Sequence, residues 1–294
     1  MIDLTRLPVR PTTRFAPSPT GLLHLGHVVN AVWTWGIARA AGGRVILRIE
    51  DHDRGRCRPE FESAILADLA WLGLAADAGP TRQSDRPGRY AGALDRLRPG
   101  TSIYGCECSR RVIAAAVGGQ TEGEEVRYPG TCRDKALGLG AHLGIRARLP
   151  DETVSFSDLR LGDIAQTPLL QCGDLLLRDQ TGGWTYQWSV AVDDLEDGVD
   201  LVIRGEDLVE STGRQILLGG MLGRAAPAGF LHHPLIMGDH ARKLSKRDGA
   251  EGIAVLRGAG VAPAAVLGRA AWLSGLQPDP APIAAPELGR LFRR

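Results

Sequence analysis

The chain has 294 residues, of which 44% are hydrophobic and 23% are charged, a composition typical of a soluble globular protein. Lys and Arg total 35 against 34 for Asp and Glu, so the overall charge does not indicate nucleic-acid binding, which would have to rest on a local patch. The apolar runs are too short to span a bilayer, and the N-terminus lacks the apolar segment of a signal peptide. We therefore expect a cytoplasmic protein without membrane contacts.

In the first third of the chain, strand-like and helix-like patterns alternate. The expected elements are a loose arm over residues 1–11, a strand over 12–16, a turn over 19–21, a helix over 27–41, a strand over 45–50 and a helix that opens at Pro59. The first helix is predicted from apolar side chains at helical spacing that end at Gly42-Gly43, and the second strand from its nearly continuous apolar character. This alternation predicts an α/β protein with a parallel sheet.

Residues 105–181 interrupt this alternation and read as an insertion. The segment holds a cysteine cluster, a Gly/Glu-rich loop and two strand-like stretches, near 145–149 and 175–177. Five cysteines are an odd number, so a complete disulfide framework is not expected. The α/β pattern then returns, with a strand over 201–204, a helix over 211–222, a helical region over 252–274 and a proline-rich extended stretch over 278–286.

The turn after the first strand is followed by His24 and His27, with Gly26 between them. A helix that begins at the edge of a parallel sheet presents unpaired N–H groups and the positive end of its dipole, which suits phosphate. Gly26 allows a nucleotide to approach the backbone, and the two histidines can donate hydrogen bonds to phosphate oxygens. Taken alone, the pattern is equally typical of a turn with two capping histidines.

A second motif lies far downstream, where Lys243, Lys246 and Arg247 surround Ser245. Loop lysines suit a step in which pyrophosphate leaves and charge on the α-phosphate must be neutralised. So short a run is, alone, more typical of a solvated basic turn, but its order after the first motif favours ATP-dependent activation of a carboxylate. The catalytic candidates are His24, His27, Lys243 and Lys246, and the candidate ATP contacts are Gly26, His27 and Lys246, with Mg²⁺ accompanying ATP.

Together these motifs resemble those of class I aminoacyl-tRNA synthetases of the glutamyl type. The matching stretches are RFAPSPTG at 14–21, HLGH at 24–27, RIED at 48–51, Tyr186 with VDD at 192–194, IRGED at 203–207 and KLSKR at 243–247. The resemblance implies a Rossmann-type nucleotide-binding fold interrupted by an insertion. It also implies a division into a catalytic part over 1–104 and 182–237, an insertion over 105–181, and the signature loop with a helical region that contacts the RNA stem over 238–294.

The same resemblance implies a glutamate pocket. Its residues carry over to Arg14, Phe15, Ala16, Pro17, Ser18, Glu50, Tyr186 and Arg204. Glutamate offers two carboxylates and one ammonium, which two arginines and one carboxylate complement. Glu50 is expected to hold the amine, Arg14 and Arg204 the carboxylates, and Tyr186 to supply a hydroxyl and a wall. Taken singly, Glu50 is more typical of a surface ion pair, Arg204 of a charge at a strand end and Tyr186 of a core aromatic; their joint occurrence favours the pocket.

The insertion carries Cys106, Cys108 and Cys132, a spacing that predicts a structural zinc site with a fourth ligand from elsewhere. Short bacterial glutamyl-queuosine tRNA(Asp) synthetases resemble this chain and imply Tyr128 as that ligand. His142 is the alternative fourth ligand, and three unligated cysteines are the alternative to a metal site.

The chain continues for about 45 residues beyond the second motif, which is short beside full-length glutamyl-tRNA synthetases with their anticodon-binding region. We therefore expect no such region, and a monomer that transfers glutamate to queuosine in tRNA(Asp), as the short paralogues do. The alternatives are a truncated glutamyl-tRNA synthetase that charges an acceptor end, a catalytically silent paralogue that binds amino acid or tRNA, and a nucleotidylyltransferase with a similar histidine motif.

Overall fold

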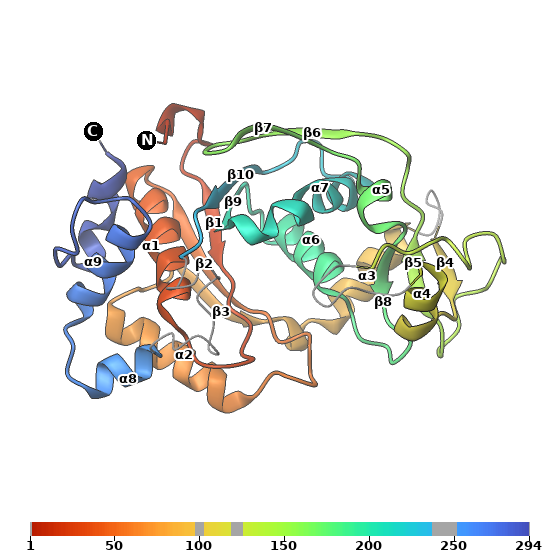
Figure 1. Ribbon diagram of the computed structural model, residues 1–294, viewed down its shortest axis with the longest axis horizontal. Helices are drawn as coiled ribbons and strands as arrows, with labels where there is room; N and C mark the ends of the chain where they lie inside the picture. The colour runs from red at the N-terminus through yellow and green to blue at the C-terminus, as the bar shows by residue number, and fades with distance from the viewer. Residues whose placement is uncertain (1, 98–102, 119–125, 237–251, 294) are drawn as a thin grey trace.

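The structure is a computed structural model that describes residues 2–97, 103–118, 126–236 and 252–293 (Figure 1). The chain begins with η1 (Leu4–Arg6), β1 (Thr12–Phe15), α1 (Leu25–Ala40), β2 (Arg44–Ile49), α2 (Pro59–Leu72), β3 (Ala78–Arg82), η2 (Gln83–Asp85) and α3 (Pro87–Leu97). It continues with β4 (Ile103–Cys106), α4 (Arg110–Ala116), β5 (Gly144–Ala147), β6 (Val154–Asp158), β7 (Gly162–Gln166), α5 (Pro168–Cys172) and β8 (Leu175–Arg178). The remaining elements are α6 (Tyr186–Glu196), β9 (Leu201–Gly205), η3 (Glu206–Ser211), α7 (Thr212–Met221), β10 (Gly229–His233), α8 (Ile253–Gly258), α9 (Pro263–Leu273) and η5 (Ala285–Phe292).

Parallel strands form the centre of the larger part of the molecule. β1 pairs with β2, β2 with β3, and β9 with β10, all in parallel. The two sets meet where the backbone N–H of Asp200 donates to the carbonyl of Thr12 at 3.1 Å. In β2 only Arg44 is exposed, as expected of a strand covered on both faces. The predicted α/β fold with a parallel sheet is confirmed.

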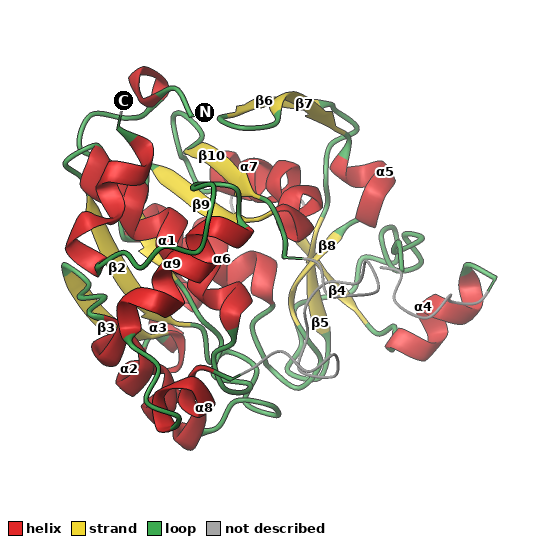
Figure 2. Cartoon of the chain, turned by 60° about the vertical axis from the view of Figure 1, so that its left-hand side comes forward, coloured by secondary structure: helices red, strands yellow, loops and turns green. Residues whose placement is uncertain are grey.

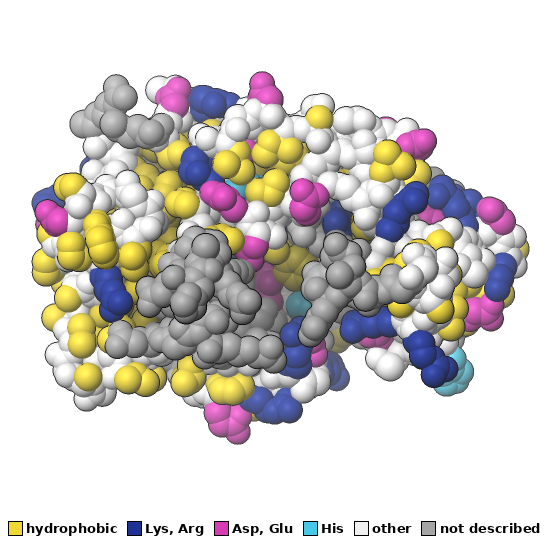
Figure 3. All heavy atoms as spheres, in the orientation of Figure 1, with side chains coloured by type: hydrophobic (Ala, Val, Ile, Leu, Met, Phe, Trp, Pro, Cys, Tyr) yellow, Lys and Arg dark blue, Asp and Glu magenta, His cyan; other side chains and the backbone are white. Residues whose placement is uncertain are grey.

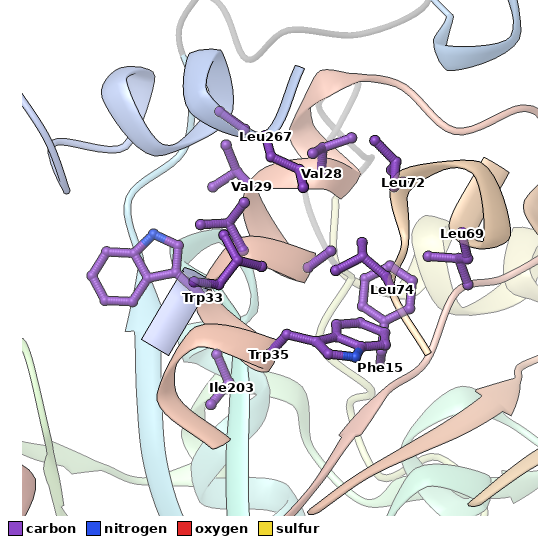
Figure 4. Close-up of a cluster of buried hydrophobic side chains, with 14 of the residues drawn as sticks. Phe15, Val28, Val29, Trp33, Trp35, Leu69, Leu72, Leu74, Ile203 and Leu267 are labelled. Carbon is purple, nitrogen blue, oxygen red and sulfur yellow. The ribbon is translucent and has the colours of Figure 1, made fainter. Parts of the chain in front are cut away.

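Helix α1 lies within the largest hydrophobic core and joins the sheet to the C-terminal segment (Figure 4). The helix is apolar on nearly every side, as buried helices are. Trp35 packs against Phe15 of β1 with 5.2 Å between ring centroids, and Trp33 packs against Phe292 of η5 at 5.3 Å. These large aromatic contacts attach η5 to α1, the helix whose first turn carries the histidine motif.

A further sheet, formed by β4, β5 and β8, is antiparallel and lies with α4 at the other end of the molecule (Figures 1 and 2). The hairpin of β6 and β7 does not join it, because β6 pairs with β10 at Asp158 opposite Phe230. The segment predicted as an insertion therefore contributes strands to two sheets, the antiparallel one and the one that contains β9 and β10. It also shares a core with α6, in which Leu177 and Trp188 are fully buried.

The C-terminal and N-terminal segments differ in detail from the prediction. The helical region predicted over 252–274 is confirmed for α8 and α9, but it is interrupted between these two helices. Gly260 has a φ of +74° and Pro263 opens α9, so the chain turns between them. The predicted loose arm contains η1, which Asp3 caps by accepting the N–H of Thr5 at 3.0 Å. Among the described helices, none combines the length and the apolar character needed to cross a bilayer.

Candidate active site

Helix α1 begins with two histidines that cap its first turn. Nδ1 of His24 accepts the backbone N–H of Gly26, and Nδ1 of His27 accepts the backbone N–H of His24, both at 3.1 Å. A neutral imidazole that accepts at Nδ1 carries its proton on Nε2, so each ring has a donor on the nitrogen that the cap does not use. A side chain at Gly26 would approach the His24 ring to 3.0 Å, so the cap leaves little room for any residue but glycine.

A cavity of about 250 Å³ adjoins this helix start. Its walls come from His24 and His27, from Gly205 at the end of β9 and from residues 233–236 at the end of β10. All of these follow the carboxyl ends of parallel strands, where open α/β sheets bind ligands. Two of the predicted ATP contacts, Gly26 and His27, line the cavity. The predicted lysines at 243 and 246 lie outside the described residues.

A buried cluster of charged side chains joins β1, β2 and α6. Asp194 lies between two guanidinium groups, 3.1 Å from Nε of Arg14 and 2.8 Å from Nη2 of Arg48. The same Nη2 lies 3.1 Å from Oε1 of Glu50. None of the four side chains is more than 7% exposed, and charges so deeply buried require partners of opposite sign.

The pKa values of the two carboxyl groups in this cluster are shifted in opposite directions. Burial raises the pKa of Glu50 above its ordinary value, although Arg48 and Arg14 act against it. Burial would also raise the pKa of Asp194, but its contacts with Arg14 and Arg48 hold that pKa below its ordinary value. Asp194 is therefore a fixed anion, whereas a further cation beside Glu50 would stabilise the ionised form of that carboxyl group.

Arg204 of β9 is held by a separate set of neutral partners. Its Nε donates to Nε2 of His232 at 3.1 Å, its Nη1 to Oε1 of Gln215 at 2.7 Å and its Nη2 to Oγ1 of Thr212 at 2.8 Å. Burial raises the pKa of Tyr186, and the charge of Arg204 acts against this rise. The charges of Glu50 and Arg14 also reach Tyr186, so the structure brings these four predicted residues together.

The remaining predicted glutamate contacts lie on or just after β1. The ring of Phe15 points into the core toward Trp35, so only its backbone can face a ligand (Figure 4). Pro17 is buried, and its carbonyl accepts the N–H of Glu50 at 3.0 Å, which ties the turn to β2. Ala16 is half-buried and Ser18 is exposed.

Sequence reasoning missed the residues that hold this pocket. They are Arg48, Asp158, Asp194, Thr212, Gln215 and His232. Arg48 could have been found, because an arginine within an otherwise apolar strand indicates a buried partner of opposite charge. The polar partners of Arg204 show no comparable signal, because they meet it only in the folded chain.

A larger cavity, of about 600 Å³, is lined by Tyr186 together with His52, whose ring centroid lies 6.2 Å from that of the tyrosine. Arg54, Arg56 and Arg110 also line it, and all three are exposed. Figure 3 shows further basic side chains gathered at the end of the molecule that carries β4, β5 and α4. Asp53 and Asp179 line the cavity as well, and Asp53 lies 2.6 Å from Nε of Arg56, so part of this positive charge is paired.

The three clustered cysteines converge as predicted. The sulfur atoms of Cys106, Cys108 and Cys132 lie within 4.8 Å of one another, and the hydroxyl of Tyr128 lies 3.6 Å from Sγ of Cys106. All five cysteines belong to the described residues, and none of them forms a disulfide. His142 is exposed and stands outside the group of converging ligand atoms. Three thiols with a buried hydroxyl beside them form a donor set that fits Zn²⁺.

Arg146 of β5 lies against this cluster. Its Nε donates to Sγ of Cys106 at 3.3 Å, and its guanidinium carbon lies 3.6 Å from the centre of the Tyr128 ring. Burial would raise the pKa of Cys106, but the contacts with Arg146 and Tyr128 hold it below its ordinary value. A cation in this place favours a thiolate, which is the form that binds metal.

Residues 10–280 match the family described as tRNA synthetases class I (E and Q), catalytic domain. The chain belongs to this family. As a class I aminoacyl-tRNA synthetase it is an enzyme of the ligase class. The motifs at residues 14–27 and 203–207 both lie within the matched range.

Two relatives and one solved structure illustrate the position of this synthetase in the family. It is 44% identical, over 95% of its length, to a glutamyl-Q tRNA(Asp) synthetase of Symbiobacterium thermophilum, and covers 91% of that protein. It is 42% identical, over 90% of its length, to a glutamate–tRNA ligase of Oleidesulfovibrio alaskensis, and covers 58% of that protein. The crystal structure of a glutamate tRNA ligase from Elizabethkingia meningosepticum is similar with a TM-score of 0.80 at 28% identity, over 96% of this chain and 64% of that one.

Proposed function

We propose that this synthetase activates L-glutamate with ATP and transfers it to the queuosine base in the anticodon of tRNA(Asp). The family match supports the reaction type. The similarity to a glutamyl-Q tRNA(Asp) synthetase, over 91% of that protein, supports the acceptor. The observation that carries the choice of amino acid is the convergence of Arg14, Arg204, Glu50 and Tyr186 in one buried region.

In this proposal the pocket matches glutamate group by group. Arg14 and Arg204 bind the two carboxylates, and the Tyr186 hydroxyl adds a further hydrogen bond. Glu50 binds the α-ammonium. Burial raises the pKa of Glu50, and a bound ammonium would act against this rise, as Arg48 and Arg14 do.

The first step joins glutamate to AMP. An oxygen of the α-carboxylate bonds to the α-phosphorus of ATP as the bond from that phosphorus to the pyrophosphate oxygen breaks. The Nε2–H groups of His24 and His27 and the first N–H groups of α1 stabilise the charge on the phosphate oxygens. We assign Lys243 and Lys246 to the departing pyrophosphate, on the basis of their sequence motif. Mg²⁺ enters with ATP as part of the substrate.

The second step transfers the glutamyl group to RNA. A hydroxyl oxygen of the cyclopentene ring of queuosine bonds to the acyl carbon, AMP leaves with the oxygen that joined it to that carbon, and the hydroxyl proton passes to solvent. The larger cavity suits this substrate, since Tyr186 and His52 offer flat surfaces for a base. Its arginines, Arg54, Arg56 and Arg110, suit the phosphates of the stem-loop.

We assign a structural Zn²⁺ to Cys106, Cys108, Tyr128 and Cys132, and this ion would hold the end of β4 to the loop before β5. A zinc ion with four protein ligands has no open position for catalysis. We further propose that residues 1–104 and 182–237 form the catalytic part, that 105–181 serve recognition of RNA, and that 238–294 supply the signature loop and a contact to the RNA stem.

Two assays test the proposal. With ATP and labelled pyrophosphate, the enzyme should exchange label into ATP when glutamate is present, and glutamine and aspartate should not replace glutamate. With labelled glutamate, tRNA(Asp) that contains queuosine should become labelled, and the same tRNA without queuosine should not. Label at the queuosine nucleoside after nuclease digestion supports the proposal, and label at the 3′-terminal adenosine contradicts it.

The second candidate is a glutamyl-tRNA ligase that charges an acceptor end. The 42% identity to the Oleidesulfovibrio glutamate–tRNA ligase favours it. Charging that is independent of queuosine would establish this candidate. The absence of any pyrophosphate exchange would instead favour a silent paralogue that binds amino acid or tRNA.

A further inference from the structure

Asp158, at the end of β6, is a fully buried carboxylate enclosed by hydrogen-bond donors. Its Oδ1 accepts the backbone N–H groups of Arg160 at 2.9 Å and Leu161 at 2.8 Å. Its Oδ2 accepts the backbone N–H of His232 at 3.1 Å and lies 2.8 Å from Nδ1 of the same residue. Because all these groups come from backbone or ring nitrogens, the carboxylate orients both the turn after β6 and the imidazole on β10.

These contacts determine the tautomer of His232. A carboxylate has no hydrogen to donate, so Nδ1 of the ring must carry the hydrogen that Asp158 accepts. Burial lowers the pKa of His232, and Asp158 only partly opposes this, so the ring is neutral. Nε2 is then an acceptor, and it receives the Nε–H of Arg204 at 3.1 Å.

We infer that Asp158 and His232 are positioning residues that orient the Arg204 guanidinium for a carboxylate of glutamate. The inference rests on the role of Arg204 in the proposed function. His232 lies opposite Arg204 in the pairing of β10 with β9, so its Nε2 meets the Nε edge of the guanidinium. Gln215 and Thr212 each take one further hydrogen. Of the five N–H donors of an arginine, this leaves one on each Nη for Tyr186 and the substrate.

The same chain of contacts makes the amino-acid pocket depend on the hairpin of β6 and β7. Asp158 belongs to this hairpin, which lies in the segment that interrupts the parallel strands, yet it lies only one side chain away from Arg204. The hairpin therefore has a role in selecting the amino acid, separate from any contact that its neighbours make with RNA.

A matched pair of substitutions at His232 tests the inference in the whole enzyme. His232→Asn places an amide nitrogen near the position of Nδ1 and keeps the donor to Asp158, but it removes the acceptor for Arg204. His232→Gln places an amide oxygen near the position of Nε2 and can keep that acceptor. In pyrophosphate exchange, H232N should raise the KM for glutamate about tenfold and leave the KM for ATP within about twofold, and H232Q should have a clearly smaller effect.

Asp158→Asn tests the other end of the pair. If the amide nitrogen that this substitution introduces faced the ring, His232 would have to accept at Nδ1 and would turn an N–H toward the N–H of Arg204. If it faced the turn, it would oppose the N–H groups of Arg160 and Leu161. Asp158→Asn should therefore raise the KM for glutamate as H232N does, without changing the KM for ATP.

Arg204→Ala serves as the reference, and thermal unfolding shows which variants are folded. If the wild type shows no exchange with glutamate, or if R204A keeps the wild-type KM for glutamate, the proposed function of the pocket fails. If R204A raises that KM but folded H232N does not, or if H232N and H232Q are equal, the inference alone fails. Should D158N not fold, the H232N and H232Q pair decides.

Discussion

Glu50 and Asp194 share the guanidinium of Arg48, yet burial and pairing move their pKa values in opposite directions. Asp194 contacts two arginines and stays ionised, so it anchors Arg14 and Arg48. Within the described residues, Arg48 is the one arginine at ion-pair distance from Glu50. Two carboxylates a few ångströms apart are thus suited to different tasks, one structural and the other the binding of an ammonium.

Replacement of Arg48 by methionine should lower the free energy of unfolding. It would leave Glu50 and Asp194 buried with part of their compensating charge removed, a loss of about 3–5 kcal/mol in the free energy of unfolding. The matched control is Arg290→Met, which breaks an exposed pair with Glu287 and should cost no more than about 1 kcal/mol. Denaturant titration of both variants measures the difference, and equal losses would contradict the assigned role of the buried cluster.

His233 should make the fold sensitive to acid. Burial lowers the pKa of this residue from 6.5 to about 4 in the folded protein. As the pH falls from about 7 to about 4, the unfolded chain binds a proton that the folded chain does not, so the free energy of unfolding decreases by up to about 3 kcal/mol from this group. Denaturant titrations across this range should show a smaller decrease in His233→Asn, and parallel curves for the two proteins would contradict the assignment.

Helix α1 links the histidine motif to strand β1 and to the C-terminal segment η5. Its first turn carries the histidine cap, its middle packs on β1 through Trp35, and its outer side receives η5. The close approach of η5 requires a glycine in the helix, because a Cβ on Gly36 would lie 2.3 Å from the ring of Phe292. Glycine lowers the helix propensity at this position, and the contact with Phe292 compensates for that loss.

Gly36→Ala should destabilise the protein by about 1–3 kcal/mol, because Phe292 and the backbone of η5 must move. Gly220→Ala in α7 is the matched control. There a Cβ would meet no atom within 4 Å, so the better helix propensity of alanine should stabilise the protein by about 0.5–1 kcal/mol. Thermal unfolding gives both values, and a change of the same sign in both variants would argue against the packing of η5 on α1.

The two ends of the molecule differ in what holds them together. The catalytic part has an extensive aliphatic and aromatic core around α1. Among the described residues, the core beneath α4 has five buried members, Tyr104, Cys106, Ile113, Tyr128 and Cys132, and the aliphatic side chains of Val126 and Leu137 are only partly buried against it. So small a core contributes little hydrophobic free energy, so a metal ion on its cysteines would supply much of the local stability.

Removal of the proposed Zn²⁺ by a chelator should therefore loosen this end alone. Backbone hydrogen exchange should accelerate in β4, α4 and the segment around Tyr128, while protection in α1 and β2 stays unchanged. Mass spectrometry of peptides from the metal-loaded and chelated enzyme measures both regions. Re-addition of Zn²⁺ should restore the slow exchange, and a uniform acceleration along the chain would contradict a local role.

Much of the architecture was predictable because the signals are local. The sequence pattern located β1, α1, β2 and the start of α2 to within about two residues, and the break in that pattern located the segment that holds the antiparallel sheet. The division between α8 and α9 was missed, although Gly260 and Pro263 are residues typical of a turn and of the start of a new helix. The spacing of Cys106, Cys108 and Cys132 predicted their convergence, which the sulfur positions confirm.

The support of the pocket was not predictable in the same way. His232 lies 28 residues from Arg204 and 74 residues from Asp158 along the chain, and nothing in the local sequence patterns links the three. Their contact follows from the pairing of β6, β10 and β9, which depends on how the interrupting segment folds back onto the parallel strands.

The amino-acid order was sufficient for the family and for naming residues that the fold brings together, because strand and helix periods, turn residues and signature motifs are all expressed within short stretches. Tertiary structure alone decided which carboxylate anchors an arginine, which histidine is neutral and which residue of the interrupting segment reaches the pocket. Those properties depend on burial and on distances between residues remote in the chain, and both are set only when the strands pair and the chain folds.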